Sequence, residues 1–216
     1  MASADNPSRD RILTRVRSAV GTPAPPPRSS PRRPFFAPVT DPLERFEREC
    51  EANKTELILA TDEVASAAAV ESILDSLPAG EAFVQDTPAL RSLTKSFMIP
   101  RQLRWSSEGA PRESSEATIT NAELLVALTG SILVSASCGG RGASIVAPCH
   151  IVVARLEQLV PDLETALAHV RERGIDSRNS FVGLITGSSR TADIEKILVL
   201  GAHGPRRLVV VLQTGA

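Results

Sequence analysis

Runs of aliphatic residues alternate with amphipathic segments along most of this chain. Continuous aliphatic runs are typical of strands buried on both faces, and apolar positions at helical spacing are typical of helices that pack on such a sheet. From residue 43 onward, the pattern predicts strands and helices in alternation. We therefore expect an α/β domain with an open, mostly parallel sheet flanked by helices.

Element boundaries follow from the apolar periodicity and from the positions of Pro and Gly. Strands are expected at residues 56–60, 82–85, 117–120, 130–135, 150–155, 181–185 and 207–212. Helices are expected at residues 43–50, 62–77, 88–96, 122–128, 161–173 and 191–200. The polar stretch 101–116 is expected to run over the surface.

Two segments precede this domain. Within residues 1–20, a helix over 8–20 gathers its apolar positions on one side, namely Ile12, Leu13, Val16 and Val20. Residues 21–42 contain eight prolines and are expected to form an extended linker to the domain at 43–216. The sequence is compatible with a mobile helix and with one that docks on its own domain, a second protomer or another protein.

Composition narrows the class of protein. Hydrophobic residues make up 42% of the chain and aromatic residues only 3%, which predicts a core of aliphatic side chains. The net charge of -1 argues against sequence-independent binding of nucleic acid and favours a small molecule or a protein as partner. We see no export signal, and the longest apolar run, 124–136, is broken by polar residues and is too short for a membrane span. With three widely spaced cysteines, we expect a cytoplasmic protein with reduced thiols.

The stretch 181–195 is typical of a buried strand that runs through a Gly/Ser turn into the start of a helix. There the first backbone N–H groups lack helical partners and the helix dipole adds partial positive charge. A phosphate or carboxylate is expected at this turn, contacting Gly187, Ser188, Ser189, Arg190 and Thr191. The turn is equally typical of Ser188 or Ser189 serving only as the helix N-cap. In open parallel sheets ligands bind beyond the carboxyl ends of the strands, where this junction is expected to lie.

A second candidate is the glycine-rich stretch 138–142. Arg141 could clamp a carboxylate with two parallel hydrogen bonds, while a tight turn would explain the glycines equally well. His150, at the start of the next strand, is a candidate general base or a buried imidazole that fixes loops. The adjacent Cys149 should point to the face of that strand opposite His150, so the two side chains are not expected to pair. Because Cys138, Cys149 and His150 lack the ligand spacing of zinc or iron–sulfur motifs, no metal site is predicted. We also predict no cofactor and assign no catalytic residue.

The third candidate is His203, in the stretch 199–205. Gly201 is expected to end the preceding helix. His203 then either faces the ligand cleft or interacts with the carboxyl end of that helix.

These stretches, in this order, resemble the LUD-domain family and, within it, the lactate utilisation protein C (LutC/YkgG) group. The resemblance covers residues 43 to the C-terminus. It rests on Ala127-Leu-Thr-Gly-Ser131, Arg141-x-x-Ser144 with Pro148 and His150-Ile-Val-Val, Ile185-Thr-Gly-Ser-Ser-Arg-Thr-Ala-Asp-Ile-Glu195, and Leu200-Gly-Ala-His-Gly-Pro205. Thr129 and Gly130, in the first segment, join the candidate ligand-binding residues.

The resemblance implies a fold like that of the sugar-phosphate isomerase and CoA-transferase group (NagB/RpiA/CoA-transferase-like). It also implies an accessory to iron–sulfur proteins that oxidise lactate to pyruvate. Such an accessory would bind a small organic anion, lactate-like, pyruvate-like or phosphorylated, or partner subunits, or would form a homo-oligomer. The alternative is an isomerase or acyl-CoA-transferase-like enzyme that binds substrate through Arg190, Arg141 and His150. Family members usually carry Glu in place of Leu128 and Pro in place of Ser188, and loss of that acid weakens the enzyme alternative.

Overall fold

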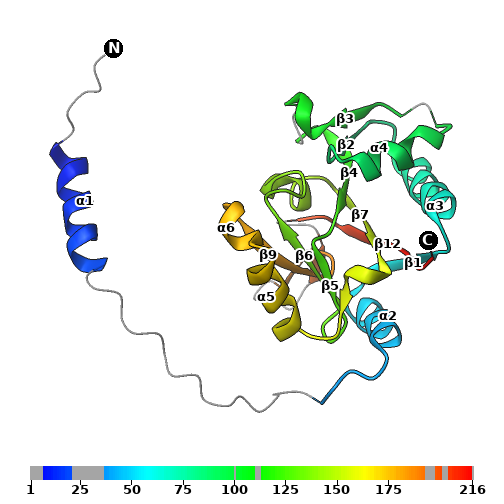
Figure 1. Ribbon diagram of the computed structural model, residues 1–216. Helices are drawn as coiled ribbons and strands as arrows, with labels where there is room; N and C mark the ends of the chain where they lie inside the picture. Colours follow the sequence, from blue (N-terminus) through cyan, green and yellow to red (C-terminus); the bar gives the residue numbers. More distant parts are fainter. Residues whose placement is uncertain are drawn as a thin grey trace. The chain divides into compact units, whose positions relative to one another are not determined.

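A computed structural model describes residues 7–20, 37–99, 101–109, 113–192, 198–200 and 204–215 (Figure 1). The chain divides into two compact units, Met1–Ala37 and Pro38–Ala216. In the first unit, helix α1 (Pro7–Val20) is the helix that the apolar spacing predicts, and none of its residues is buried. Most of the proline-rich segment 21–42 lies outside the described residues.

A six-stranded sheet forms the centre of the second unit, and every pair of neighbouring strands in it is parallel. Its strands, in spatial order, are β1 (Glu56–Ala60), β12 (Arg207–Gln213), β7 (Cys149–Arg155), β4 (Ser115–Asn121), β2 (Glu81–Val84) and β3 (Leu103–Trp105). Parallel strands leave all their carboxyl ends at one edge of the sheet, which therefore collects the loops that follow them.

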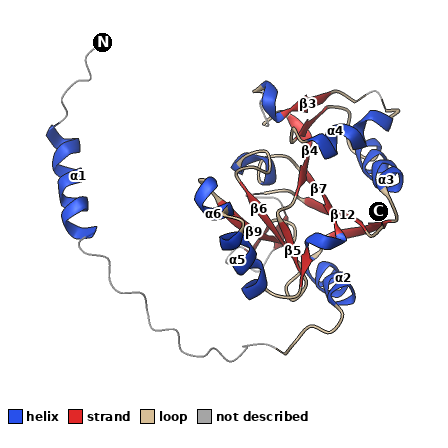
Figure 2. Ribbon diagram, in the orientation of Figure 1, coloured by secondary structure: helices blue, strands red, loops and turns tan. Residues whose placement is uncertain are grey.

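Both faces of this sheet are covered (Figure 2). Helices α3 (Glu63–Asp75) and α4 (Pro88–Leu93) pack on one face in a common apolar cluster, and α2 (Pro42–Asn53) packs on the other. Side chains alternate along a strand, so Ile151 of β7 joins the α3–α4 cluster whereas Val152 joins the α2 cluster. This alternation decides which strand-end residues point toward α3 and α4.

A second, four-stranded sheet lies on the α2 side and shares that apolar cluster. Its strands, in order, are β8 (Leu159–Val160), β5 (Leu124–Val126), β6 (Ser131–Ser135) and β9 (Val182–Thr186). Helices α5 (Leu163–Glu172) and α6 (Ile175–Arg178) cover its far face. Short 3-10 turns occur at Thr94–Ser96, Ser106–Glu108, Arg141–Ser144 and Leu156–Gln158.

The remaining strands and helices expected from the sequence are confirmed, with ends that shift by up to three residues. In the middle of the chain one expectation was wrong, and one surface strand was not expected. The helix expected at 122–128 is strand β5, because Leu125 packs toward the main sheet while Leu124 and Val126 pack toward α5, so the run is buried on two opposite faces. The polar stretch 101–116 contains the edge strand β3, paired with β2.

The helix expected at 191–200 was also wrong. Within this stretch the described residues form an antiparallel ribbon of β10 (Arg190–Ala192) and β11 (Leu198–Leu200). Gly187 adopts φ +79°, and the Ser189 N–H donates to the Pro205 carbonyl at 2.9 Å. The turn that follows β9 therefore lies beside residues 204–205. Strand β9 belongs to the second sheet, so this junction is not at the carboxyl edge of the parallel sheet.

None of the helices in the described part of the chain combines the length and apolar character that a bilayer crossing requires.

Candidate anion-binding site at the carboxyl edge of the sheet

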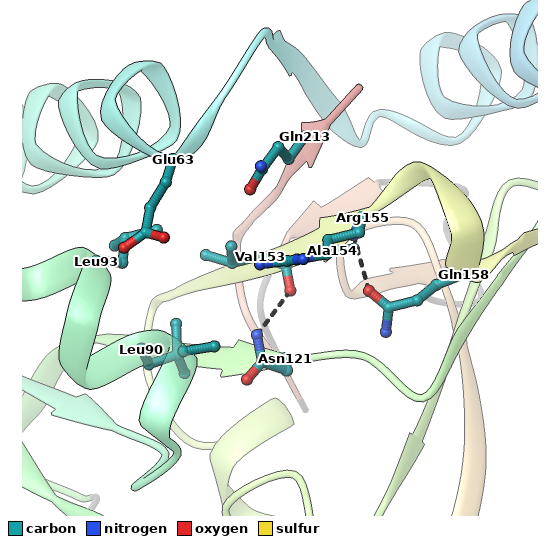
Figure 3. Close-up of a pocket in the computed structure, with 10 residues that line it drawn as sticks. Glu63, Leu90, Leu93, Asn121, Val153, Ala154, Arg155, Gln158 and Gln213 are labelled. Carbon is teal, nitrogen blue, oxygen red and sulfur yellow. Dashed lines mark hydrogen bonds between the residues drawn. The ribbon is translucent and has the colours of Figure 1, made fainter. Parts of the chain in front are cut away.

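A cavity of about 300 Å³ lies beyond the carboxyl ends of β4, β7 and β12 (Figure 3). We call it the edge cavity. It is lined by Glu63, Ala89, Leu90, Leu93, Asn121, Val153, Ala154, Arg155, Gln158 and Gln213. Open parallel sheets place their ligands in this position, so the edge cavity is the first candidate for a binding site.

Three polar residues mark the strand ends that border the edge cavity: Asn121 on β4, Arg155 on β7 and Gln213 on β12. Each follows its strand's alternation onto the face that carries α3 and α4, because Ile119, Val153 and Val211 two residues earlier pack in that cluster. Arg155 and Gln213 are direct partners in the β7–β12 register. Neighbouring strands lie about 4.8 Å apart, so these two side chains project side by side.

Two helices supply the opposite wall. Thr87 caps α4 by accepting the Leu90 N–H at 3.2 Å, which presents the apolar side chains of Leu90 and Leu93 to the cavity. Asp62 caps α3 by accepting the Ala65 N–H at 2.8 Å, and Glu63 follows in the first turn. Figure 3 shows the Glu63 carboxylate above Leu93 and the Gln213 side chain directed into the space between them and β7.

The side chains of Asn121 and Gln158 form hydrogen bonds with other groups of the protein. Asn121 donates from Nδ2 to the Val153 carbonyl at 3.0 Å and accepts from the Thr87 hydroxyl at 3.0 Å. Gln158 accepts the Arg155 N–H at 2.7 Å and donates to the Ala122 carbonyl at 2.6 Å. These contacts hold the floor of the edge cavity rigid and leave ligand binding to other groups.

Three groups at the edge cavity retain unused capacity. The Arg155 guanidinium has no carboxylate within ion-pair distance among the described residues. Gln213 donates to the Gly215 carbonyl at 2.9 Å, which leaves its Oε1 without a donor from the described part of the chain. The half-buried Glu63 carboxylate likewise has no ion pair there. The cavity thus offers one cation and two acceptors.

A second cavity, of about 290 Å³, is lined by residues from several of the segments on which the family resemblance rests. We call it the signature groove. Its lining residues are Ser144, Ile145, Phe181, Gly183, Leu184, Ile185, Gly187, Ser189, Gly204 and Pro205. The groove gathers two of the predicted ligand-binding residues, Gly187 and Ser189. Ser188 is buried beside them.

Arg141 lies next to this groove, with its guanidinium carbon 5.0 Å from the centre of the Phe181 ring. The glycines before it have a structural cause: Gly139 and Gly140 adopt φ of +80° and +84°, and a Cβ on Gly139 would lie 3.3 Å from the Phe83 ring. The interpretation of this stretch as a tight turn is supported. A ligand role for Arg141 stays a prediction.

Thr129 and Gly130 form the turn between β5 and β6. The Thr129 hydroxyl shares a 2.7 Å hydrogen bond with Ser131, which shares another of 2.7 Å with Thr186. The Thr129 carbonyl accepts from Asn53 of α2 at 2.9 Å. The turn thus joins α2 to the end of β9, immediately before Gly187.

His150 lines neither cavity. It is 1% exposed, its Nε2 shares a 2.9 Å hydrogen bond with the Thr120 hydroxyl, and burial lowers its pKa to about 4. Cys149 points into the cluster on the opposite face, as expected. Burial raises the pKa of all three thiols, to about 12 for Cys50 and about 11 for Cys138 and Cys149, so they are poor nucleophiles at neutral pH.

The other predicted residues lie at the margin of the described structure. Arg190 and Thr191 contribute backbone to β10, and His203 lies outside the described residues. Since β10 is a strand, the expected helix-dipole contribution to an anion site at this turn is wrong.

Sequence motifs did not point to Asn121, Arg155 or Gln213. A usable signal was present, because each of these polar residues ends or directly follows a strand expected from the sequence.

Residues 111–213 match the LUD domain. Lactate utilization protein C of Deinococcus radiodurans is 33% identical over 109 residues, which is 48% of this chain and 49% of that protein. Lactate utilization protein C of Bacillus subtilis is 25% identical over 181 residues, 76% of this chain and 74% of that protein. These matches support the LUD-domain family as the family of this chain. The chain spans about half the length of the first curated relatives it matches.

A solved structure supports the fold of this chain. The crystal structure of a DUF162 family protein from Deinococcus radiodurans superposes with a TM-score of 0.63 and 18% identity, over 81% of this chain and 96% of that one. The α/β fold with a mostly parallel sheet is thereby confirmed.

Proposed function

We propose that this protein serves lactate utilisation by binding a small organic anion in the edge cavity, as an accessory to the iron–sulfur proteins that oxidise lactate to pyruvate. The observation that carries the proposal is Arg155, an exposed residue that lines the cavity and whose guanidinium has no carboxylate partner among the described residues. Relatives named lactate utilization protein C support the assignment to lactate metabolism.

An arginine suits this task because its planar guanidinium pairs with a carboxylate or phosphate through two parallel hydrogen bonds. Each charge-assisted hydrogen bond contributes about 1.5–3 kcal/mol. The volume of about 300 Å³ accommodates a three-carbon acid together with water, and it also accommodates a phosphorylated anion.

The signature groove is a second place for the anion, because Gly187 and Ser189 line it and Arg141 lies beside it. We rank it below the edge cavity because Arg141 stacks on Phe181 and His150 is buried elsewhere. The same placement counts against the alternative of an isomerase or acyl-CoA-transferase-like enzyme. Two of the three residues assigned to its substrate, Arg141 and His150, do not line the edge cavity.

Calorimetric titration of the full chain with lactate, pyruvate and a sugar phosphate tests the ligand and its place. We expect Arg155→Ala to weaken binding about 10- to 100-fold, since it removes one or two charge-assisted hydrogen bonds. The matched control is Arg171→Ala, an exposed arginine on α5 that should leave binding unchanged. Loss of binding in Arg141→Ala, with Arg155→Ala unaffected, would move the site to the signature groove. Binding of none of these anions by folded protein would refute the ligand proposal.

The partnership needs its own experiment. We expect the full chain to co-purify with the iron–sulfur lactate-oxidation proteins of its own organism. Light scattering on the free chain determines whether it also forms a homo-oligomer. An iron–sulfur preparation that oxidises lactate at the same rate with and without this chain, and never retains it, contradicts the accessory role.

A further inference from the structure

Some polar side chains of the edge cavity form hydrogen bonds within the protein, whereas others keep groups that can bind a ligand. Asn121 and Gln158 are committed to protein partners, which leaves Arg155 as donor and the oxygens of Gln213 and Glu63 as acceptors. A ligand that presents only acceptors can satisfy Arg155 and nothing else. The cavity therefore discriminates by whether a ligand also carries a hydrogen-bond donor.

Gln213 makes this discrimination strong. Its side chain is 7% exposed, and its orientation is fixed because Nε2 donates to the Gly215 carbonyl at 2.9 Å. The Oε1 atom is consequently presented to the cavity and cannot exchange places with Nε2 without breaking that bond (Figure 3). A ligand acceptor placed against Oε1 would displace water from it without replacing the hydrogen bond of that water, which is unfavourable for the complex.

Arg155 and Gln213 are also neighbours across the sheet. They are partners on adjacent parallel strands, whose backbones lie about 4.8 Å apart, and both continue the strand face that packs toward α3 and α4. In a 2-hydroxycarboxylate the hydroxyl lies on the carbon next to the carboxylate. One such molecule can therefore face Arg155 with its carboxylate and donate its hydroxyl proton to Gln213 Oε1 or to Glu63.

Resting on the anion binding proposed above, we infer that the edge cavity selects short 2-hydroxycarboxylates over 2-oxocarboxylates, with Gln213 and Glu63 as the specificity-determining residues. A 2-oxo acid keeps the carboxylate but replaces the hydroxyl by a second acceptor. Its oxo oxygen would face the carbonyl of Gln213 and the negative charge of Glu63. A plain carboxylate such as propionate has neither the favourable hydroxyl nor the unfavourable oxo group, so its affinity should lie between those of the 2-hydroxy and the 2-oxo acid.

Calorimetry with lactate, propionate and pyruvate on the full chain tests this order of affinities. We expect lactate to bind at least about tenfold more tightly than pyruvate, with propionate in between. Gln213→Met keeps the length of the side chain but removes the acceptor, and should bring lactate affinity close to that of propionate. Glu63→Gln introduces a donor and should strengthen pyruvate. The matched control is Glu164→Gln, an exposed acid in the first turn of α5 that does not line the cavity, which should change the affinity for neither lactate nor pyruvate.

The outcomes separate the two proposals. Equal affinities for lactate and pyruvate, both lost in Arg155→Ala, would overturn the selectivity and leave the anion site intact. Tighter binding of pyruvate than of lactate would also overturn the selectivity and leave the anion site intact. A preference for lactate that Gln213→Met and Glu63→Gln leave unchanged would overturn the residue assignment. Failure of all three acids to bind would overturn the proposed function and the selectivity together.

Discussion

His150 makes the stability of this protein depend on pH. Its imidazole is 1% exposed, Nε2 shares a hydrogen bond with Thr120, and Nδ1 has no partner among the described residues. Burial lowers its pKa from 6.5 to about 4 because the charged form loses its hydration without gaining a counter-ion. The imidazole is therefore neutral in the folded protein at pH values well above 4.

The direction in which stability changes with pH follows from proton uptake by the unfolded chain. Between pH 6.5 and 4, the unfolded chain binds a proton at His150 that the folded chain does not bind, so stability falls as the pH falls. Above pH 6.5 both states are neutral, and the full stability is present. The pKa difference corresponds to a loss of about 3 kcal/mol once the pH is below 4, most of it between pH 6.5 and 4.5.

The assay is urea unfolding at a series of pH values between 4.5 and 8, for the native chain and for His150→Gln, which cannot titrate. The variant removes this contribution while the carboxylates titrate equally in both proteins, so the difference in unfolding free energy isolates His150. We expect the native chain to lose about 2–3 kcal/mol relative to the variant on going from pH 8 to 4.5. Parallel pH profiles would show that His150 is hydrated or paired in solution and would refute the argument.

Two further predictions concern packing and reactivity. Gly130→Ala should destabilise the protein by about 1–3 kcal/mol in urea unfolding, because Gly130 adopts φ +62° and a Cβ would lie 2.8 Å from Glu49 Cβ; unchanged stability would mean that α2 can move away. Labelling of the three cysteines with iodoacetamide at pH 8 should be at least about 100-fold slower in the native than in the urea-unfolded chain, because burial raises their pKa to about 11 or higher. Comparable rates would contradict their burial.

The architecture of the main sheet could be predicted because its strands are unbroken aliphatic runs buried on both faces. The same property caused one error. Residues 124–126 are as apolar as a buried helix, and only the tertiary contacts of Leu124 and Leu125 on opposite faces distinguish a strand from a helix there.

The candidate site was harder to predict for a different reason. The sequence shows that Gly187 and Ser189 follow a strand, but it does not show to which sheet that strand belongs. Because β9 joins β6 in the second sheet, the turn after it lies apart from the carboxyl edge where Arg155 and Gln213 meet. Strand order decides which polar strand ends become neighbours, and that order depends on long-range pairing.

The central claim is that a small organic anion binds in the edge cavity with its carboxylate on Arg155. A crystal structure of the full chain with lactate tests it most directly. We expect lactate between β7, β12 and the first turn of α3, with its carboxylate at Arg155 and its hydroxyl at Gln213 or Glu63. Lactate bound instead at Gly187 and Ser189 in the signature groove, or an edge cavity that stays empty at saturating lactate, would contradict it.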